Sequence, residues 1–238
     1  MKLDILAFAA HPDDVEISSG GTLLKYISEG KKIGVVDLTK GELGTRGSAE
    51  LRMSEAKKAS ELLGLSVREN LNMKDGFFEE TEENKLKIIQ EIRKYQPEIV
   101  LANSISDRHP DHGNAGKLVA DACFLSGLQK IETTCDGKLQ KAYRPRLVLH
   151  YIQDYYLEPD IAVDVSAFAE QKIKVIQAYK SQFFDPQSSE PNTPISGEEF
   201  FDFLKGRMMS VGRPFGANYG EGFTISRVFG VSDLFQLL

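Results

Sequence analysis

The stretch LDILAFAAHPDDVE, residues 3–16, joins an apolar run directly to a polar one. Its first eight residues are rich in aliphatic side chains and predict a buried β-strand over residues 3–10. A histidine, a proline and two adjacent aspartates, Asp13 and Asp14, follow at once, although the two carboxylates repel each other. The stretch therefore predicts a strand that ends either in a functional turn or in an ordinary polar surface turn.

Strands and helices alternate beyond this stretch. Further strands are expected at 32–39, 67–73, 98–103, 146–152 and 160–166. Helices are expected at 22–30, 48–64, 81–97, 113–128, 167–183 and 197–210, and a glycine-rich tail at 211–223. Because parallel neighbours need crossover connections, this order predicts an α/β fold of three layers, with a mostly parallel sheet and helices on both faces.

Length and composition narrow the class of protein. With 238 residues, we expect one domain over 1–238. The net charge of -6 argues against a general affinity for nucleic acid or anionic membranes. Asp4 interrupts the apolar start, and no run reaches the roughly 18 apolar residues of a spanning helix. We therefore expect a soluble, cytoplasmic protein, with Cys123 and Cys135 as reduced thiols.

Three of the four histidines follow predicted strands. His11 comes after the strand at 3–10, and the octapeptide DRHPDHGN (107–114), which holds His109 and His112, comes after the strand at 98–103. The carboxyl ends of parallel strands meet at one edge of the sheet, where open α/β sheets bind ligands. His150, the fourth, stands near the end of the strand at 146–152, which brings it toward the same rim.

This set of residues predicts a catalytic metal site. Catalytic zinc typically has three histidine or carboxylate ligands and one open position. His11, Asp14 and one of His109 or His112 would supply them. His11 and Asp14 are three residues apart and share a face once the chain turns helically, whereas Asp13 is rotated away and suits a general base.

The histidine that is not a ligand would donate to an oxyanion or protonate a leaving group, with Asp111 fixing its tautomer. Each motif also has a structural interpretation, since HPDD can be a polar turn that caps a helix and HPDH a loop before an N-capped helix. Both motifs at strand ends favour the metal site.

Asp37 is placed like a ribose-binding acid, but the first strand lacks the glycine fingerprint, so no nucleotide cofactor is expected.

AHPDDVE, together with HPDH about a hundred residues later, resembles the PIG-L / LmbE-like family of zinc-dependent N-deacetylases, which act on N-acetylglucosamine-containing substrates. The order of strands and helices over most of the chain is also similar to the Rossmann-like fold of that family. The resemblance implies that His11, Asp14 and His112 hold the zinc.

The resemblance also implies that Asp13 is the general base. It further implies that His109 stabilises the tetrahedral intermediate or protonates the amine, and that Asp111 orients His109. Mycothiol-type relatives carry a carbonyl-polarising tyrosine two residues before the first histidine of HPDH. In this chain Asp107 stands at that position. His150 and Tyr151 are candidate substitutes for the tyrosine.

Within the family, residues 39–56, the DRHPDH segment and the late NYGEGF look most similar to the branch of bacillithiol biosynthesis, which deacetylates N-acetylglucosaminyl malate. Malate brings two carboxylates, and the planar fork of arginine suits bidentate carboxylate recognition. Arg46, Arg52 and Arg108 are therefore candidate substrate-binding residues, with Arg213 a weaker one.

The leading hypothesis is a hydrolase with one Zn²⁺ per chain, although Fe²⁺ fits the same ligands. Its expected partner is a small-molecule N-acetylglucosaminyl substrate, with no nucleic acid and no membrane, and a homo-oligomer is compatible with the sequence. One alternative is deacetylation of another N-acetylglucosamine conjugate or of a chitooligosaccharide. Others are phosphoester hydrolysis, which usually needs two ions, and a non-catalytic carbohydrate-binding protein with a vestigial metal site. The loop at 185–197 is expected at the surface, where it could move over the site.

Overall fold

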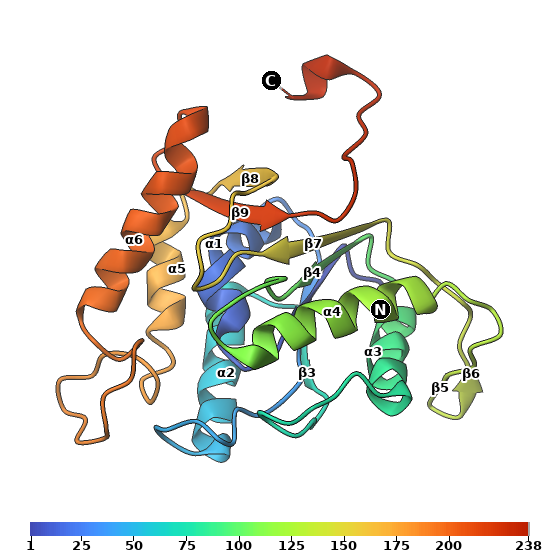
Figure 1. Ribbon diagram of the computed structural model, residues 1–238, viewed down its shortest axis with the longest axis horizontal. Coiled ribbons are helices and arrows are strands. Elements are labelled where there is room, and N and C mark those ends of the chain that lie inside the picture. Colours follow the sequence, from blue (N-terminus) through green and yellow to red (C-terminus); the bar gives the residue numbers. More distant parts are fainter. Residues whose placement is uncertain (238) are drawn as a thin grey trace.

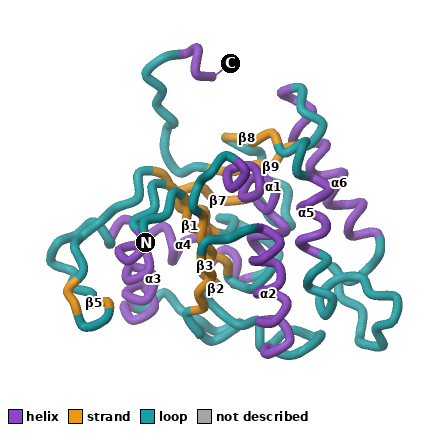
Figure 2. Tube along the Cα trace, turned by 180° about the vertical axis from the view of Figure 1, so that it is seen from behind, coloured by secondary structure: helices purple, strands orange, loops and turns teal. Residues whose placement is uncertain are grey.

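The computed structural model describes residues 1–237, which build a seven-stranded sheet between two layers of helices (Figures 1 and 2). In their order across the sheet the strands are β3 (Val67–Asn70), β2 (Ile33–Asp37), β1 (Ile5–Ala9), β4 (Ile99–Ala102), β7 (Leu147–Tyr151), β9 (Gly220–Thr224) and β8 (Ile161–Asp164). The first five are parallel, whereas β9 is antiparallel to both neighbours. A separate hairpin consists of β5 (Thr134–Cys135) and β6 (Lys138–Leu139). The predicted mostly parallel α/β sheet is confirmed.

Helices cover both faces of this sheet, as predicted. One layer contains α1 (Asp14–Ser28), α2 (Ala49–Leu63) and α5 (Ala169–Ile176), and the other contains α3 (Glu82–Tyr95) and α4 (Pro110–Leu125). α6 (Glu199–Gly212) lies beside α5 and packs against β8 and β9 (Figure 1). Short 3-10 turns follow at Arg213–Phe215 and Leu234–Leu237. Among residues 1–237, no helix has the length and apolar character needed to cross a membrane.

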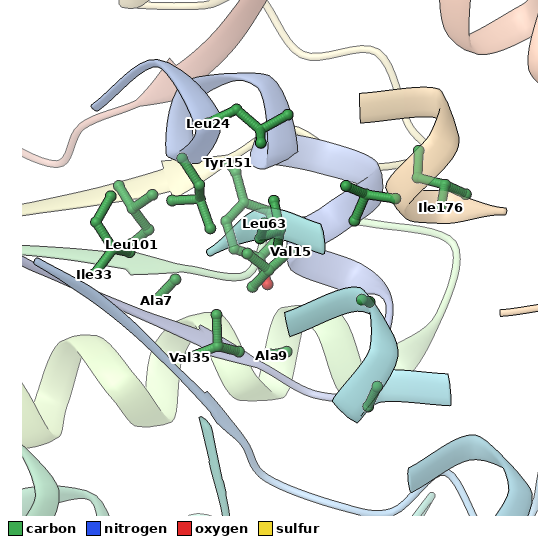
Figure 3. Packing of buried hydrophobic residues seen from close by; sticks show 14 of the residues in the cluster. Ala7, Ala9, Val15, Leu24, Ile33, Val35, Leu63, Leu101, Tyr151 and Ile176 are labelled. Carbon is green, nitrogen blue, oxygen red and sulfur yellow. The ribbon is translucent and has the colours of Figure 1, made fainter. Parts of the chain in front are cut away.

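Two apolar clusters fill the space between the layers. Successive side chains of a strand point to opposite faces, so Ala7 of β1 joins the cluster under α1, α2 and α5, whereas Phe8 joins the cluster under α3 and α4. Figure 3 shows Val15 and Leu24 of α1 and Ile176 of α5 in the first cluster. All five residues of β1 are buried, as expected of a parallel strand that is covered on both faces.

Local signals set most helix boundaries. Ser48 caps α2 by accepting a hydrogen bond from Leu51 N at 3.2 Å, and Gly64 ends it in the left-handed region at φ 80°. The prediction for α1 was wrong at its start: the helix begins at Asp14 and not at residue 22, because the HPD turn leads straight into it. α5 ends at Ile176, before the predicted residue 183.

The strand β9 was not predicted. Its sequence, GEGFT, lies in the tail that was expected to be irregular, and glycine weakens a strand in isolation. The strand forms because it inserts between β7 and β8, where all five of its residues are buried. At Gly222 a Cβ would lie 3.0 Å from Pro159 Cβ and 3.2 Å from Ile152 Cδ1, so any larger residue would force these neighbours to shift.

The sheet order places a topological switch between β1 and β4. From β1 the chain builds β2 and β3 on one side and then returns to place β4 on the other. The loops after β1 and β4 therefore emerge side by side at the carboxyl edge, where ligands bind in such sheets. α4 approaches this edge closely, since a Cβ on Gly116 would lie 2.8 Å from the carbonyl oxygens of Asn103 and Ser104.

Candidate functional site

A cavity of about 480 Å³ opens at the carboxyl edge of the sheet. Its lining includes five of the predicted catalytic and metal-ligating side chains, namely His11, Asp13, Asp14, His109 and His112. The first three follow β1, and the two later histidines come from the β4–α4 connection and from α4 itself. The fold therefore brings together two motifs that lie about a hundred residues apart in the sequence.

The two adjacent aspartates point in different directions. Asp13 has a positive φ of 115°, a strained conformation for a residue with a side chain, and its side chain makes no helix-capping hydrogen bond. The Asp13 Oδ2 accepts a hydrogen bond from Arg52 Nη2 at 2.8 Å. Asp14 instead accepts from the backbone N–H of His11 at 3.0 Å. The turn is therefore not a simple helix cap, and each carboxylate has its own partners.

Asp14 lies between two of the predicted metal ligands. Its Oδ1 is 3.1 Å from His112 Nε2, and its Oδ2 is 3.7 Å from His11 Nδ1. Asn103 Nδ2 and Gln153 Nε2 donate to the same carboxylate at 2.9 and 3.2 Å. Burial opposes its charge, but His112 and His11 hold the pKa of Asp14 well below its usual range. Two imidazole nitrogens thus face one ionised carboxylate.

His109 lies beside these residues and has a different hydrogen-bond partner. Ligand atoms of His11, His109 and His112 all lie within 4.8 Å of one another. The His109 Nδ1 accepts a hydrogen bond from the backbone N–H of Asp111 at 3.2 Å, so the neutral ring carries its proton on Nε2. Burial, followed by the charges of His11 and His112, lowers the pKa of His109. A neutral His109 is therefore suited to donate from Nε2.

Asp107 holds His112 in place, a role that the sequence interpretation missed. His112 Nδ1 is hydrogen-bonded to Asp107 Oδ2, and Asp107 Oδ1 accepts from the backbone N–H groups of Asp154 and Tyr155 at 2.9 and 2.7 Å. Burial opposes charging of His112, but Asp14 and Asp107 raise its pKa to about 10. Asp107 was treated only as the replacement for a tyrosine, although a carboxylate next to a ligand histidine is the usual orienting partner.

Two further carboxylates hold His11. His11 Nε2 lies 3.0 Å from Asp75 Oδ1 and 3.3 Å from Asp111 Oδ2, which leaves Nδ1 turned toward Asp14. The expectation that the Asp111 carboxylate orients His109 is not met, because the carboxylate faces His11 and Gly76 N, and only the Asp111 backbone reaches His109. Asp75 was missed, although it follows β3 and thus also lies at the carboxyl edge.

The predicted arginines have different surroundings. Arg52 and Arg108 line the cavity, but Arg52 is buried against Asp13 and the carbonyl oxygen of Pro12. Arg46 does not line the cavity, because it turns toward the loop at 185–197 and bonds Ser188 Oγ at 2.7 Å. Arg46 thus joins two loops, and Arg52 supports Asp13.

His150 and Tyr151, the suggested substitutes for the missing tyrosine, face away from the cavity. His150 Nδ1 donates to the carbonyl oxygen of Asn103 at 2.8 Å, and the Tyr151 hydroxyl donates to the carbonyl oxygen of Phe8 at 2.8 Å. Both side chains are buried. Neither lines the cavity, so that suggestion was wrong.

The site offers the ligand groups that a divalent cation needs. Burial opposes charge on His11, but Asp111, Asp75 and Asp14 raise its pKa to about 9, which means that these carboxylates favour positive charge here. Two histidine nitrogens and a carboxylate that meet at one wall of a cavity match the ligand set of a mononuclear zinc site. The residues present therefore fit such an ion.

The chain is similar to proteins of one family. The family model PIG-L, described as GlcNAc-PI de-N-acetylase, matches residues 6–123. The chain is 30% identical over 189 residues to the diacetylchitobiose deacetylase of Thermococcus kodakarensis, covering 75% of this chain and 70% of that protein. It is 27% identical over 195 residues to the probable N-acetyl-alpha-D-glucosaminyl L-malate deacetylase 2 of Bacillus anthracis, with coverages of 75% and 81%. A solved structure of a conserved protein from Thermus thermophilus superposes with a TM-score of 0.85 at 34% identity, over 97% of this chain and 98% of that one.

Proposed function

Because the chain belongs to the PIG-L family of de-N-acetylases, we propose that it hydrolyses the acetamide of N-acetylglucosaminyl malate, as expected for bacillithiol biosynthesis. The coarser activity, N-deacetylation of an N-acetylglucosamine conjugate, comes with the family. The identity of the aglycone, malate, is the more specific part of the proposal. Its support is the similarity to the probable N-acetyl-alpha-D-glucosaminyl L-malate deacetylase 2 of Bacillus anthracis and the arginines on the cavity wall.

We propose His11, Asp14 and His112 as the ligands of one zinc ion. When bound, zinc would polarise the acetamide carbonyl and acidify water. The contacts of Asp14 with both histidines support this set, and they favour His112 over His109 as the third ligand. Asp107 and Asp75 keep the donor nitrogens of the two histidines aimed at Asp14.

Asp13 and His109 would carry the proton chemistry. Asp13 lines the cavity beside Asp14, and burial raises its pKa to about 7, although Arg52 counteracts this increase. A base whose pKa lies near neutrality can accept the proton of the attacking water and deliver it to the leaving amine. His109 would donate from Nε2 to the oxyanion, since its Nδ1 is occupied by the Asp111 backbone.

The observation that carries the proposal is the convergence of His11, Asp14 and His112 beside Asp13 in one cavity. The described sheet draws strands from residues 5 to 224, so we also propose that the whole chain acts as one catalytic domain. The alternative substrates are other N-acetylglucosamine conjugates, including chitooligosaccharides.

A substrate panel tests the proposal. N-acetylglucosaminyl malate, an inositol conjugate and diacetylchitobiose are each incubated with zinc-loaded and chelator-treated protein, and acetate and free amine are measured. We expect equal amounts of acetate and amine, released fastest from the malate conjugate and only with metal. Release from none of the three would overturn the deacetylase proposal, and a preference for diacetylchitobiose would overturn the malate assignment.

A further inference from the structure

Two arginines from distant parts of the chain meet on the cavity wall at Asp154. Arg108 Nε donates to Asp154 Oδ2 at 2.6 Å, and Arg207 of α6 donates through Nη2 to the Asp154 carbonyl oxygen. All three residues line the cavity. The Asp154 carboxylate thus pairs with Arg108, whereas Arg207 reaches only the backbone carbonyl oxygen and, within residues 1–237, forms no salt bridge. We call Arg108, Asp154 and Arg207 the arginine corner.

Most hydrogen-bond donors of the two arginines at the arginine corner lack an acceptor in the described residues. A guanidinium offers five N–H groups. Within residues 1–237, Arg108 makes its hydrogen bond through Nε and Arg207 through Nη2, so the remaining N–H groups of both have no acceptor in the described protein. The Phe203 ring, whose centroid is 5.0 Å from the Arg207 guanidinium, restrains its plane. Burial also lowers the pKa of Arg207, so an anion would compensate for lost hydration there.

The arginine corner adjoins the proposed zinc ligands. Asp154 N donates to Asp107 Oδ1 at 2.9 Å, and Asp107 holds His112. In an N-acetylglucosaminide the acetamide and the aglycone stand on neighbouring ring carbons. A substrate whose acetamide reaches His112 therefore places its aglycone close by, and the arginine corner is within reach on that side.

The rest of the cavity is unsuited to an anion. Asp13, Asp14, Asp75 and Asp107 also line it, and Arg52, the third arginine of its lining, is already paired with Asp13. These carboxylates would repel an anionic aglycone, whereas the N–H groups of Arg108 and Arg207 that lack an acceptor would attract it. The arginine corner is therefore the part of the cavity wall that suits an anion best.

We propose that Arg207, together with Arg108, binds the carboxylates of the aglycone and makes the enzyme prefer anionic over neutral N-acetylglucosaminides. Arg207 is then a specificity-determining residue that the sequence motifs do not contain. The inference rests on the proposed function, because it assumes that an N-acetylglucosaminide occupies the cavity.

A matched pair of substrates tests it. The dimethyl ester of N-acetylglucosaminyl malate has the same skeleton as the diacid but carries two neutral methyl ester groups in place of the carboxylates. With the zinc-loaded protein, kcat and KM are measured for both substrates. We expect Arg207→Gln to raise KM for the diacid by about 10- to 100-fold, the range for a lost charged hydrogen bond, and to leave the dimethyl ester within about twofold. The KM of Arg207→Lys for the diacid should lie between those of the wild type and Arg207→Gln, because lysine keeps the positive charge but lacks the planar guanidinium fork.

The control is Arg213→Gln. Arg213 was the weaker candidate for substrate binding, but it is exposed just beyond α6 and does not line the cavity. Thermal unfolding of each variant separates a folding defect from a loss of recognition. If Arg207→Gln and Arg207→Lys keep the wild-type preference for the diacid, or if the wild type has no such preference, the inference is wrong. If the wild type hydrolyses neither substrate, the proposed function fails instead.

Discussion

Replacement of Asp107 by asparagine should weaken zinc binding while the fold survives. Asp107 Oδ1 accepts from the backbone N–H groups of Asp154 and Tyr155, which fixes the side chain so that Oδ2 meets His112 Nδ1. An asparagine that keeps the two backbone bonds presents its NH₂ group to Nδ1–H. The imidazole then tends to move its proton to Nε2, where it blocks the lone pair that faces Asp14.

Loss of such an orienting partner typically costs 10- to 100-fold in metal affinity, or about 1.4 to 2.8 kcal/mol. We expect the zinc Kd of Asp107→Asn, measured by competition with a chromogenic chelator, to rise by that factor. Asp121→Asn is the control, because Asp121 lies on the same helix α4 but binds Lys117 at the surface. A Kd for Asp107→Asn within about threefold of the wild type would refute this reasoning about His112.

Three further predictions concern neighbouring residues. Asp13→Asn should keep its zinc, measured by elemental analysis, yet lose at least about 100-fold in kcat, because an amide cannot accept the proton; wild-type turnover would remove Asp13 as the base. Asp75→Asn should weaken zinc binding about tenfold, since His11 Nε2 loses a carboxylate partner, and an unchanged chelator competition would contradict that role. Arg52→Met should lower the free energy of unfolding by about 3 kcal/mol because the buried Asp13 loses its partner, and a denaturant midpoint equal to that of the wild type would count against the pair.

Much of the fold was predictable because its signals are local. Apolar runs of strand length predicted the parallel strands β1, β2, β3, β4 and β7, and the Ser48 cap and the Gly64 stop predicted the ends of α2. β9 could not be predicted in this way, since its glycine-rich sequence becomes a strand only between β7 and β8. The start of α1 was missed because its first eight residues include Ser18, Ser19, Gly20 and Gly21, a run that is typical of loops.

The candidate site also has a part that the sequence predicted and a part that it did not. His11 and His112 were predicted to meet because parallel strands bring their carboxyl ends to one edge, and the cavity there is lined by both. The supporting carboxylates, Asp75 and Asp107, depend on the paths of the loops after β3 and β4, which the sequence pattern does not determine. Arg207 was also missed, because it comes from a helix far along the chain.

The most direct test of the proposed zinc site is a zinc titration of metal-free protein in which acetate release from N-acetylglucosaminyl malate is followed at each addition. We predict that activity rises from the background rate and reaches its plateau at one zinc ion per chain, as a single site of His11, Asp14 and His112 requires. Full activity in the metal-free protein, or a plateau that needs two ions per chain, would contradict it.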